Sequence, residues 1–252
     1  ILLGAITSAS KLSLEKVRRA YMLMGDIGRV AEQALTNPNA IVDVRISLFS
    51  PVRPMLADMA SSIREILTSH KHGTAFEYKY DGARIQIHKR GDSVRVFSRR
   101  LTEVTGSVPE IVALAKGHVR SQETLLEGEV IAIDAHGRPL PFQDLMRRFT
   151  RVHDVPDATT RIPLELHLFD VLLLEGDELI QKPYSERREV LEREVAQELL
   201  SPRIISADQD EIQRLFDRAL AEGHEGLMAK ALDSGYEVGK RGKKWLKLKK
   251  AE

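Results

Sequence analysis

The sequence predicts an α+β domain built on antiparallel sheet, preceded by a short all-helical segment. In that first segment, apolar residues recur at helical spacing, for example at Leu14, Val17 and Tyr21. Further along, apolar and polar residues alternate on both sides of Gly91 and Asp92, which indicates a β-hairpin. Because 42% of the 252 residues are apolar, the chain can bury one sizeable core with a smaller piece attached.

The helical segment is predicted over residues 1–38, up to a break at "NPNA". Pro51 and Pro54 favour an extended backbone in the segment that follows. We therefore expect a linker at residues 39–50 and a larger domain at residues 51–252.

The larger domain begins with the hairpin, whose alternating residues lie at 85–97. Later strands are predicted at 125–133, 164–174, 203–206, 226–231 and 245–249. Helices are predicted at 109–117, 142–150, 184–199 and 209–222. Asp208 and Glu211 have the spacing of a capping box at the start of the last helix.

Composition and charge exclude several classes of protein. There is no cysteine, which rules out disulfides and thiolate metal sites and favours the reducing interior of a cell. No apolar run approaches the roughly 20 residues that span a bilayer, so we expect no membrane partner. The net charge is only +1, but "KRGKKWLKLKK" at 240–250 holds seven Lys or Arg residues and no acid. Such a strip suits either phosphate binding or an ordinary solvated surface.

Lys79 is the candidate nucleophile, in the stretch "EYKYDGARIQIHKR" at 77–90. In a strand, Glu77 and Lys79 share one face. Asp81 and Gly82 favour a turn, which would hold the amine of Lys79 at a strand end. A K-x-D-G tetrapeptide alone is weak support, because a strand lysine usually points to water.

Several sequence blocks together carry a family resemblance. The blocks, in order, are "KYDGAR" at 79–84, "FSRR" at 97–100, "LEGEV" at 126–130, "LFDVLLLEG" at 168–176, "HEGLMAK" at 224–230 and "KWLKLKK" at 244–250. With these blocks, the chain resembles the ATP-dependent DNA ligases of the archaeal and eukaryotic type over residues 48–250. Its first helices resemble the end of that family's DNA-binding domain. The resemblance implies an antiparallel-sheet nucleotidyltransferase (ATP-grasp-like ligase) domain for adenylation.

The resemblance implies a covalent mechanism with ATP and Mg²⁺. Lys79 would attack the α-phosphate of ATP and hold AMP as a phosphoramidate. AMP would then pass to the 5′-phosphate of a DNA nick, and the 3′-hydroxyl would seal the strand. A lysine amine attacks only when unprotonated, which neighbouring cations such as Arg84, Lys247 and Lys249 would favour.

The resemblance also implies roles for other residues. Glu77 would help to recognise adenine, and Phe169 would stack on the base, although "LHLFDVLLL" on its own predicts a core position for Phe169. Glu129 and Glu225 would lie near the divalent metal. Asp170 receives no role. The ribose and the phosphates would be held by Arg84, Arg99, Glu129, Arg241, Lys247 and Lys249.

The implied partner is nicked double-stranded DNA, bound by a monomer through its backbone. Arg95, Arg99 and Arg100 are the expected contacts, without sequence specificity. The resemblance further implies that the chain is part of a longer protein, lacking most of the DNA-binding domain and the OB-fold domain. A sliding clamp would recruit only that full-length protein.

Three other functions would share some of these features. A GTP-dependent mRNA-capping enzyme or an RNA ligase shares the lysine motif, but Glu77 and the helical lead-in favour the DNA ligase. A P-loop or ATP-grasp ATP-binding protein would need a different phosphate cradle, and G-x-x-x-x-G-K-[ST] does not occur. A non-enzymatic DNA-binding module would explain the basic strips but not the ordered blocks.

Overall fold

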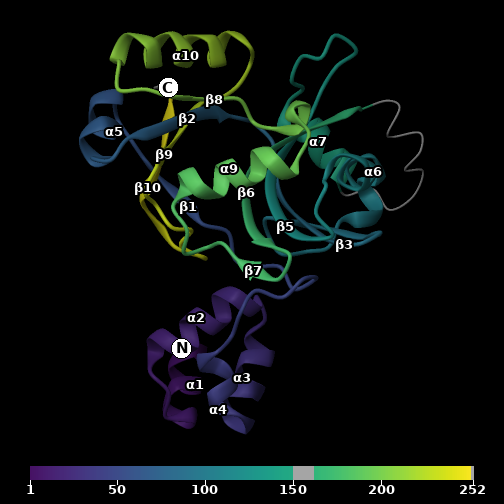
Figure 1. Cartoon of the computed structure of the whole chain (residues 1–252), viewed down its shortest axis with the longest axis vertical. Coiled ribbons are helices and arrows are strands. Elements are labelled where there is room, and N and C mark those ends of the chain that lie inside the picture. The colour runs from purple at the N-terminus through teal and green to yellow at the C-terminus, as the bar shows by residue number, and fades with distance from the viewer. Residues whose placement is uncertain (150–161, 251–252) are drawn as a thin grey trace.

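The computed structural model describes residues 1–149 and 162–250. A small group of helices lies beside a larger body that contains two five-stranded sheets (Figure 1). None of the helices in the described ranges is long and apolar enough to cross a membrane.

The small group is the helical segment predicted from the sequence. Ser13 and Asp26 cap two of its helices by accepting hydrogen bonds from backbone N–H groups of the first turn. Gly25 has a φ of 70°, and a Cβ there would lie 2.7 Å from the carbonyl oxygen of Pro51. The helices are α1 (Leu2–Ser10), α2 (Leu14–Met24), α3 (Ile27–Thr36) and α4 (Pro38–Val42).

The expected linker at 39–50 is only partly extended, which corrects the prediction. Pro38 occupies the first turn of α4, a position where proline starts a helix instead of breaking one. The remainder is packed on the protein through three buried apolar residues, Val44, Ile46 and Leu48. The assignment of residues 1–38 to a DNA-binding domain remains a prediction.

The first sheet has the strand order β1-β10-β9-β2-β8. β1 pairs with β10 in parallel, and the other pairs are antiparallel. Helices α5 (Ile63–Ser69) and α10 (Gln209–Ala221) pack on one face through Ile66, Phe76 and Ile212 (Figure 1). The strands are β1 (Leu56–Met59), β2 (Thr74–Lys79), β8 (Arg203–Ile205), β9 (Gly226–Ala231) and β10 (Arg241–Lys249).

The second sheet is antiparallel throughout, in the order β4-β3-β5-β6-β7. One face packs against three helices through residues such as Ile85, Ile87 and Leu126. The strands are β3 (Ala83–Arg90), β4 (Ser93–Ser98), β5 (Glu123–Ala132), β6 (Leu164–Leu174) and β7 (Asp177–Glu178). The helices are α6 (Pro109–His118), α7 (Phe142–Phe149) and α9 (Tyr184–Glu194), with 3₁₀ turns at Thr105–Ser107 and Gln197–Leu199.

The predicted α+β class with antiparallel sheet is confirmed, and so is the hairpin around Gly91. The helix predicted at 184–199 was too long, because Val195 is extended and bridges to Val119. Residue 150 of another predicted helix and residues 251–252 lie outside the described residues. β1, α5 and β7 were not predicted.

The predicted capping box of α10 is half formed. The side chain of Asp208 accepts from the backbone N–H groups of Asp210 and Glu211. The side chain of Glu211 instead accepts from the hydroxyl of Ser206, so the return bond to the cap is missing.

Candidate active site

The site lies on the face of the first sheet that α5 and α10 leave free. Residues paired across β2, β9 and β10 project from the same face, so sheet register brings together side chains that are far apart in the sequence. The three rows are Ala75, Lys230 and Trp245; Glu77, Met228 and Lys247; and Lys79, Gly226 and Lys249.

Lys79 and Lys249 both form ion pairs with Glu225 at the end of this face. The Lys249 Nζ lies 2.6 Å from the carboxylate. Gly226 has a φ of 139°, and a Cβ there would lie 2.1 Å from the carbonyl oxygen of Leu248, so only glycine fits between the two lysines. Burial would raise the pKa of Glu225, but hydrogen bonds from Lys249 and Lys79 outweigh it and lower that pKa.

Lys247 lies at the centre of a cluster of cations. Partial burial lowers the pKa of Lys247, and the charges of Arg241, Lys79, Lys249 and Arg99 lower it further. Arg241 and Arg99 are exposed. Five cations that repel one another on an open face favour the binding of a multiply charged anion.

Arg84 and Glu129 reach this cluster from the second sheet, where they are paired across β3 and β5. A Cβ at Gly82 would lie 2.5 Å from the carbonyl oxygen of Val130, so glycine lets the start of β3 approach β5. Burial raises the pKa of Glu129 to about 7, although Arg84, Lys79 and other cations oppose the shift.

Glu77 and Phe169 lie at the other end of the face, around a buried lysine. The Nζ of Lys230 donates to Glu77 at 2.8 Å and lies 4.3 Å from the ring centre of Phe169. Tyr184 also donates to Glu77. Phe169 is 8% exposed and meets Trp245 edge to face at 6.2 Å. Phe169 is therefore a core residue that also faces the site.

All ten residues predicted for the site lie around these two connected regions. The model of the family described as ATP dependent DNA ligase domain matches residues 54–249. The chain belongs to this family. A DNA ligase of Thermococcus fumicolans is 47% identical over 99% of this chain and 45% of the relative. A probable DNA ligase of Anaeromyxobacter dehalogenans is 44% identical over 100% of this chain and 49% of the relative.

The chain thus spans about half the length of these curated relatives. Among solved structures, the mycobacterial DNA ligase D complexed with ATP and MES matches with a TM-score of 0.60 and 28% identity, over 78% of this chain and 59% of that chain. The Chlorella virus DNA ligase-adenylate, at 20% identity and a TM-score of 0.54, covers 79% of this chain and 69% of that chain and supports the fold alone. Membership of the DNA ligase family disfavours the RNA ligase and mRNA-capping alternatives.

The carboxylates of this ligase domain suit Mg²⁺ only together with a substrate. Among the described residues, no three or more His, Cys, Asp or Glu side chains are grouped to hold a metal ion. Mg²⁺ is commonly bound by one or two carboxylates and the phosphates of a nucleotide. Glu129 and Glu225, beside the cation cluster, fit that mode of binding.

Asp170, which received no role from the sequence, forms a structural ion pair. Its carboxylate accepts from the Nε and Nη2 of Arg187 at 2.8 and 2.9 Å, and both side chains are fully buried. The pair joins β6 to α9 and leaves Asp170 unavailable to a metal.

Five residues of the candidate site were not predicted from the sequence: Glu127, Tyr184, Met228, Lys230 and Tyr236. Strand periodicity within "HEGLMAK" could have placed Met228 and Lys230 on the face of the nucleophile. Glu127 lies two residues before Glu129 in a strand and could have been found in the same way. The two tyrosines lie outside the quoted blocks and gave no signal.

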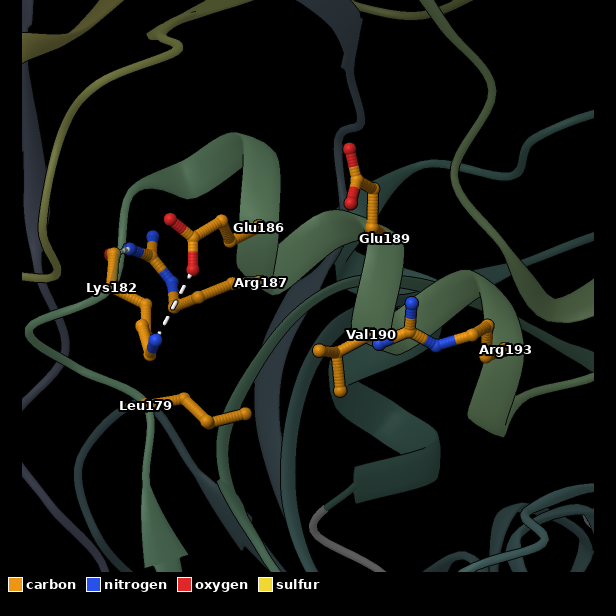
Figure 2. Close-up of a pocket in the computed structure, with 7 residues that line it drawn as sticks. All are labelled: Leu179, Lys182, Glu186, Arg187, Glu189, Val190 and Arg193. Atoms are coloured by element: carbon orange, nitrogen blue, oxygen red, sulfur yellow. Dashed lines mark hydrogen bonds and ion pairs between the residues drawn. The ribbon is translucent and has the colours of Figure 1, made fainter.

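Two hollows are lined by other residues. One of about 250 Å³ runs along α9 and is lined by Lys182, Glu186 and Arg193, among others (Figure 2). The other, of about 820 Å³, lies behind β2 and is lined by Tyr78 and His167, among others. Neither is lined by a residue predicted for the site.

Proposed function

We propose that this chain is the catalytic core of an ATP-dependent DNA ligase, with Lys79 as the nucleophile. The observation that carries the proposal is the position of Lys79 at the edge of the five-cation cluster and beside Glu225. A triphosphate bound to these cations would bring its α-phosphorus to the end of β2.

The proposed step forms a bond between the Nζ of Lys79 and the α-phosphorus of ATP. The bond from that phosphorus to the bridging oxygen breaks, pyrophosphate leaves, and the amine loses a proton. The amine of Lys79 must first leave its ion pair with Glu225. In that pair it points toward the carboxylate and not toward a phosphate. Lys247, Lys249 and Arg241 would stabilise the charge on the leaving group.

Mg²⁺, held by Glu129, Glu225 and the nucleotide, would offset the negative charge of the phosphates when it is bound. Glu77 would accept a hydrogen bond from the amino group of adenine, and Phe169 would stack on the ring. Arg84, Arg99 and Glu129 would hold the ribose and the adjoining phosphate.

The proposed second substrate is nicked double-stranded DNA, by analogy with the relatives named DNA ligase. AMP would move from Lys79 to the 5′-phosphate of the nick, and the 3′-hydroxyl would displace it. The chain would act as a monomer. Recruitment by a sliding clamp and the contribution of an OB-fold domain would belong to the full-length protein.

The test is covalent labelling by α-labelled ATP or GTP, followed by denaturation and intact-mass measurement. We expect ATP to leave one AMP on the wild-type chain and GTP to leave no label. Lys79→Arg should abolish the label, because arginine keeps its charge but does not lose its proton. Lys71→Arg, at an exposed position outside the site, is the matched control and should label normally.

Two results would contradict the proposal. Labelling of the Lys79→Arg variant at the wild-type level would remove Lys79 from the role of nucleophile. Labelling by GTP in place of ATP would favour the capping alternative.

A further inference from the structure

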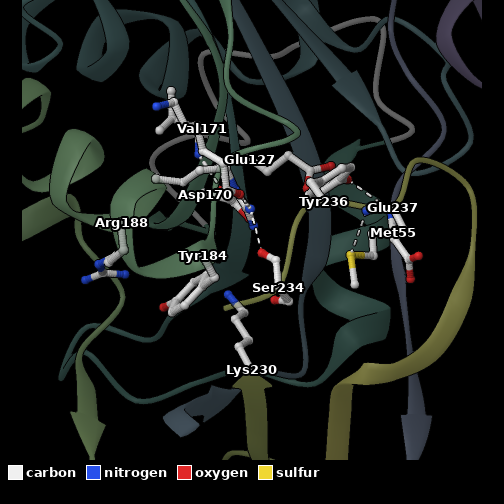
Figure 3. A network of polar contacts seen from close by, with 12 residues as sticks. Met55, Glu127, Asp170, Val171, Tyr184, Arg188, Lys230, Ser234, Tyr236 and Glu237 are labelled. Carbon is white, nitrogen blue, oxygen red and sulfur yellow. Dashed lines mark hydrogen bonds and ion pairs between the residues drawn. The ribbon is translucent and has the colours of Figure 1, made fainter. Parts of the chain in front are cut away.

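Tyr236 connects three parts of the fold through one buried hydroxyl. Its side chain is 3% exposed, and its hydroxyl donates to the Oε2 of Glu127 at 2.7 Å (Figure 3). The hydroxyl oxygen of Tyr236 also accepts from the backbone N–H of Met55 at 2.9 Å and from the Nη2 of Arg84 at 3.1 Å. A hydroxyl has one hydrogen to donate and two lone pairs, so all three are used.

Arg84 is held at both of its terminal nitrogens by the same group of residues. Its Nη2 donates to Glu127 at 2.6 Å, and its Nη1 donates to the carbonyl oxygen of Met55 at 2.6 Å. Its guanidinium carbon lies 5.4 Å from the ring centres of both Phe169 and Trp245. The protein therefore fixes the plane of the guanidinium before any ligand arrives.

The Nε of Arg84 is buried and has no hydrogen-bond partner among the described residues. Leaving a buried donor unpaired costs free energy, which an oxygen of a ligand could recover. The guanidinium lies beside Phe169, on which the base would stack, and the adjoining Glu129 lies toward the phosphate end. A hydroxyl of the ribose would occupy the space between base and phosphate.

We propose that Tyr236 is a positioning residue: through Glu127 and the backbone of Met55, it orients Arg84 so that the guanidinium reads a ribose hydroxyl of the nucleotide. This inference rests on the proposed function, because it requires a nucleotide at this face. Glu127 is fully buried, and its other oxygen accepts from Gln86 at 3.1 Å. Both oxygens of the Glu127 carboxylate are therefore hydrogen-bonded, and the bond from Tyr236 helps to fix the oxygen that Arg84 contacts.

The protonation state of Tyr236 agrees with this role. Burial raises its pKa well above the usual value, and the charge of Glu127 raises it further. The hydroxyl therefore stays protonated and keeps donating to Glu127 throughout the neutral range.

The experiment compares ATP with 2′-deoxyATP and 3′-deoxyATP as substrates for lysyl-AMP formation. Tyr236→Phe removes the hydroxyl and keeps the ring, which packs against Trp245 at 5.7 Å. We expect the variant to lose about threefold to tenfold of the preference for ATP over at least one deoxynucleotide, mainly through the KM for ATP. Glu127→Gln keeps the shape of the carboxylate and should lose the preference in the same direction.

Tyr184→Phe is the matched control, since it also removes a buried hydroxyl that donates to a glutamate, here Glu77 at the base end. It should lower the rate with ATP and both deoxynucleotides by one common factor. Thermal unfolding of every variant identifies any that fails to fold.

The outcomes separate the two claims. If the wild-type chain forms no lysyl-AMP, the proposed function fails. Equilibrium binding of the three nucleotides to the wild type and to Tyr236→Phe then tests the positioning role of Tyr236. If the wild-type chain does not discriminate against either deoxynucleotide, the positioning role is overturned. The same conclusion holds if Tyr236→Phe and Glu127→Gln lower activity equally with all three.

Discussion

His88 is a fully buried imidazole whose protonation the fold opposes. Its Nδ1 accepts from the backbone N–H of Phe49 at 3.0 Å, so the neutral ring carries its hydrogen on Nε2. Burial lowers the pKa of His88 to about 3. Below the ordinary histidine pKa, His88 binds a proton in the unfolded chain but not in the folded chain. The stability contributed by neutral His88 is therefore lost as the pH falls from about 6.5 toward 3.

We predict that His88→Asn makes the protein less sensitive to acid. Asparagine can place an acceptor oxygen where Nδ1 lies, but it has no proton to gain. Between pH 7 and pH 4 the wild-type chain should lose on the order of 3 kcal/mol of unfolding free energy more than the variant. Urea unfolding at both pH values measures the difference. His72→Asn, at an exposed position, should follow the wild type, and a parallel loss in His88→Asn would contradict the prediction.

The same scale shows which site residues could be predicted from sequence. Lys79 and Glu225 lie in short blocks with a glycine whose space or φ admits no other residue, so the local pattern is informative. Strand periodicity indicates the face on which Lys230 lies, but not its contact with Glu77, which is 153 residues away. Tyr236 and Glu127 are 109 residues apart. Such pairs depend on the register between strands and on the packing of the two sheets, which local periodicity does not determine.

At the scale of elements, β3 is more buried than its pattern indicates. Ile85 and Ile87 alternate with Gln86 and His88, which predicts a strand with one face in water. Gln86 is instead 3% exposed, and its amide bonds both the N–H and the carbonyl oxygen of Val52. With Arg84 and His88, it holds the segment 49–55 against the sheet. The polar side chains of this face bind backbone groups. In the sequence, such a face has the same pattern as one exposed to solvent.

The start of β9 depends on a glycine, Gly226. We predict that Gly226→Ala destabilises the protein by more than about 2 kcal/mol, because its φ of 139° and the carbonyl oxygen of Leu248 both exclude a Cβ. Gly117→Ala in α6 is the matched control, since nothing lies within 4 Å of a Cβ there. Alanine in that helix should be neutral or stabilise by about 0.5 kcal/mol. Urea unfolding measures both changes, and equal effects would show that the backbone at 226 is not constrained.

At the scale of the whole molecule, the charge is almost balanced, at +1. A balanced charge gives only weak long-range attraction to DNA, so the proposed DNA binding would depend on where the cations gather. Arg99, which belongs to the cation cluster of the site, and its neighbour Arg100 are both exposed just after β4. Arg64 and Arg214 are equally exposed but lie on α5 and α10, which cover the other face of the first sheet. The four residues permit a comparison at constant total charge.

We predict that nicked duplex binds through phosphate contacts on the side of the site. Each phosphate contact contributes about 0.9 to the slope of log binding constant against log salt concentration. Replacing Arg99 and Arg100 together by glutamine should reduce that slope by about 2, uniformly across DNA sequences. Replacing Arg64 and Arg214 by glutamine removes the same charge and should leave the slope unchanged. Fluorescence anisotropy with nicked duplexes of two unrelated sequences, over a range of salt concentrations and without ATP, gives both slopes. Equal reductions in the two double variants would mean that net charge governs binding, and the proposed DNA-binding side would then be wrong.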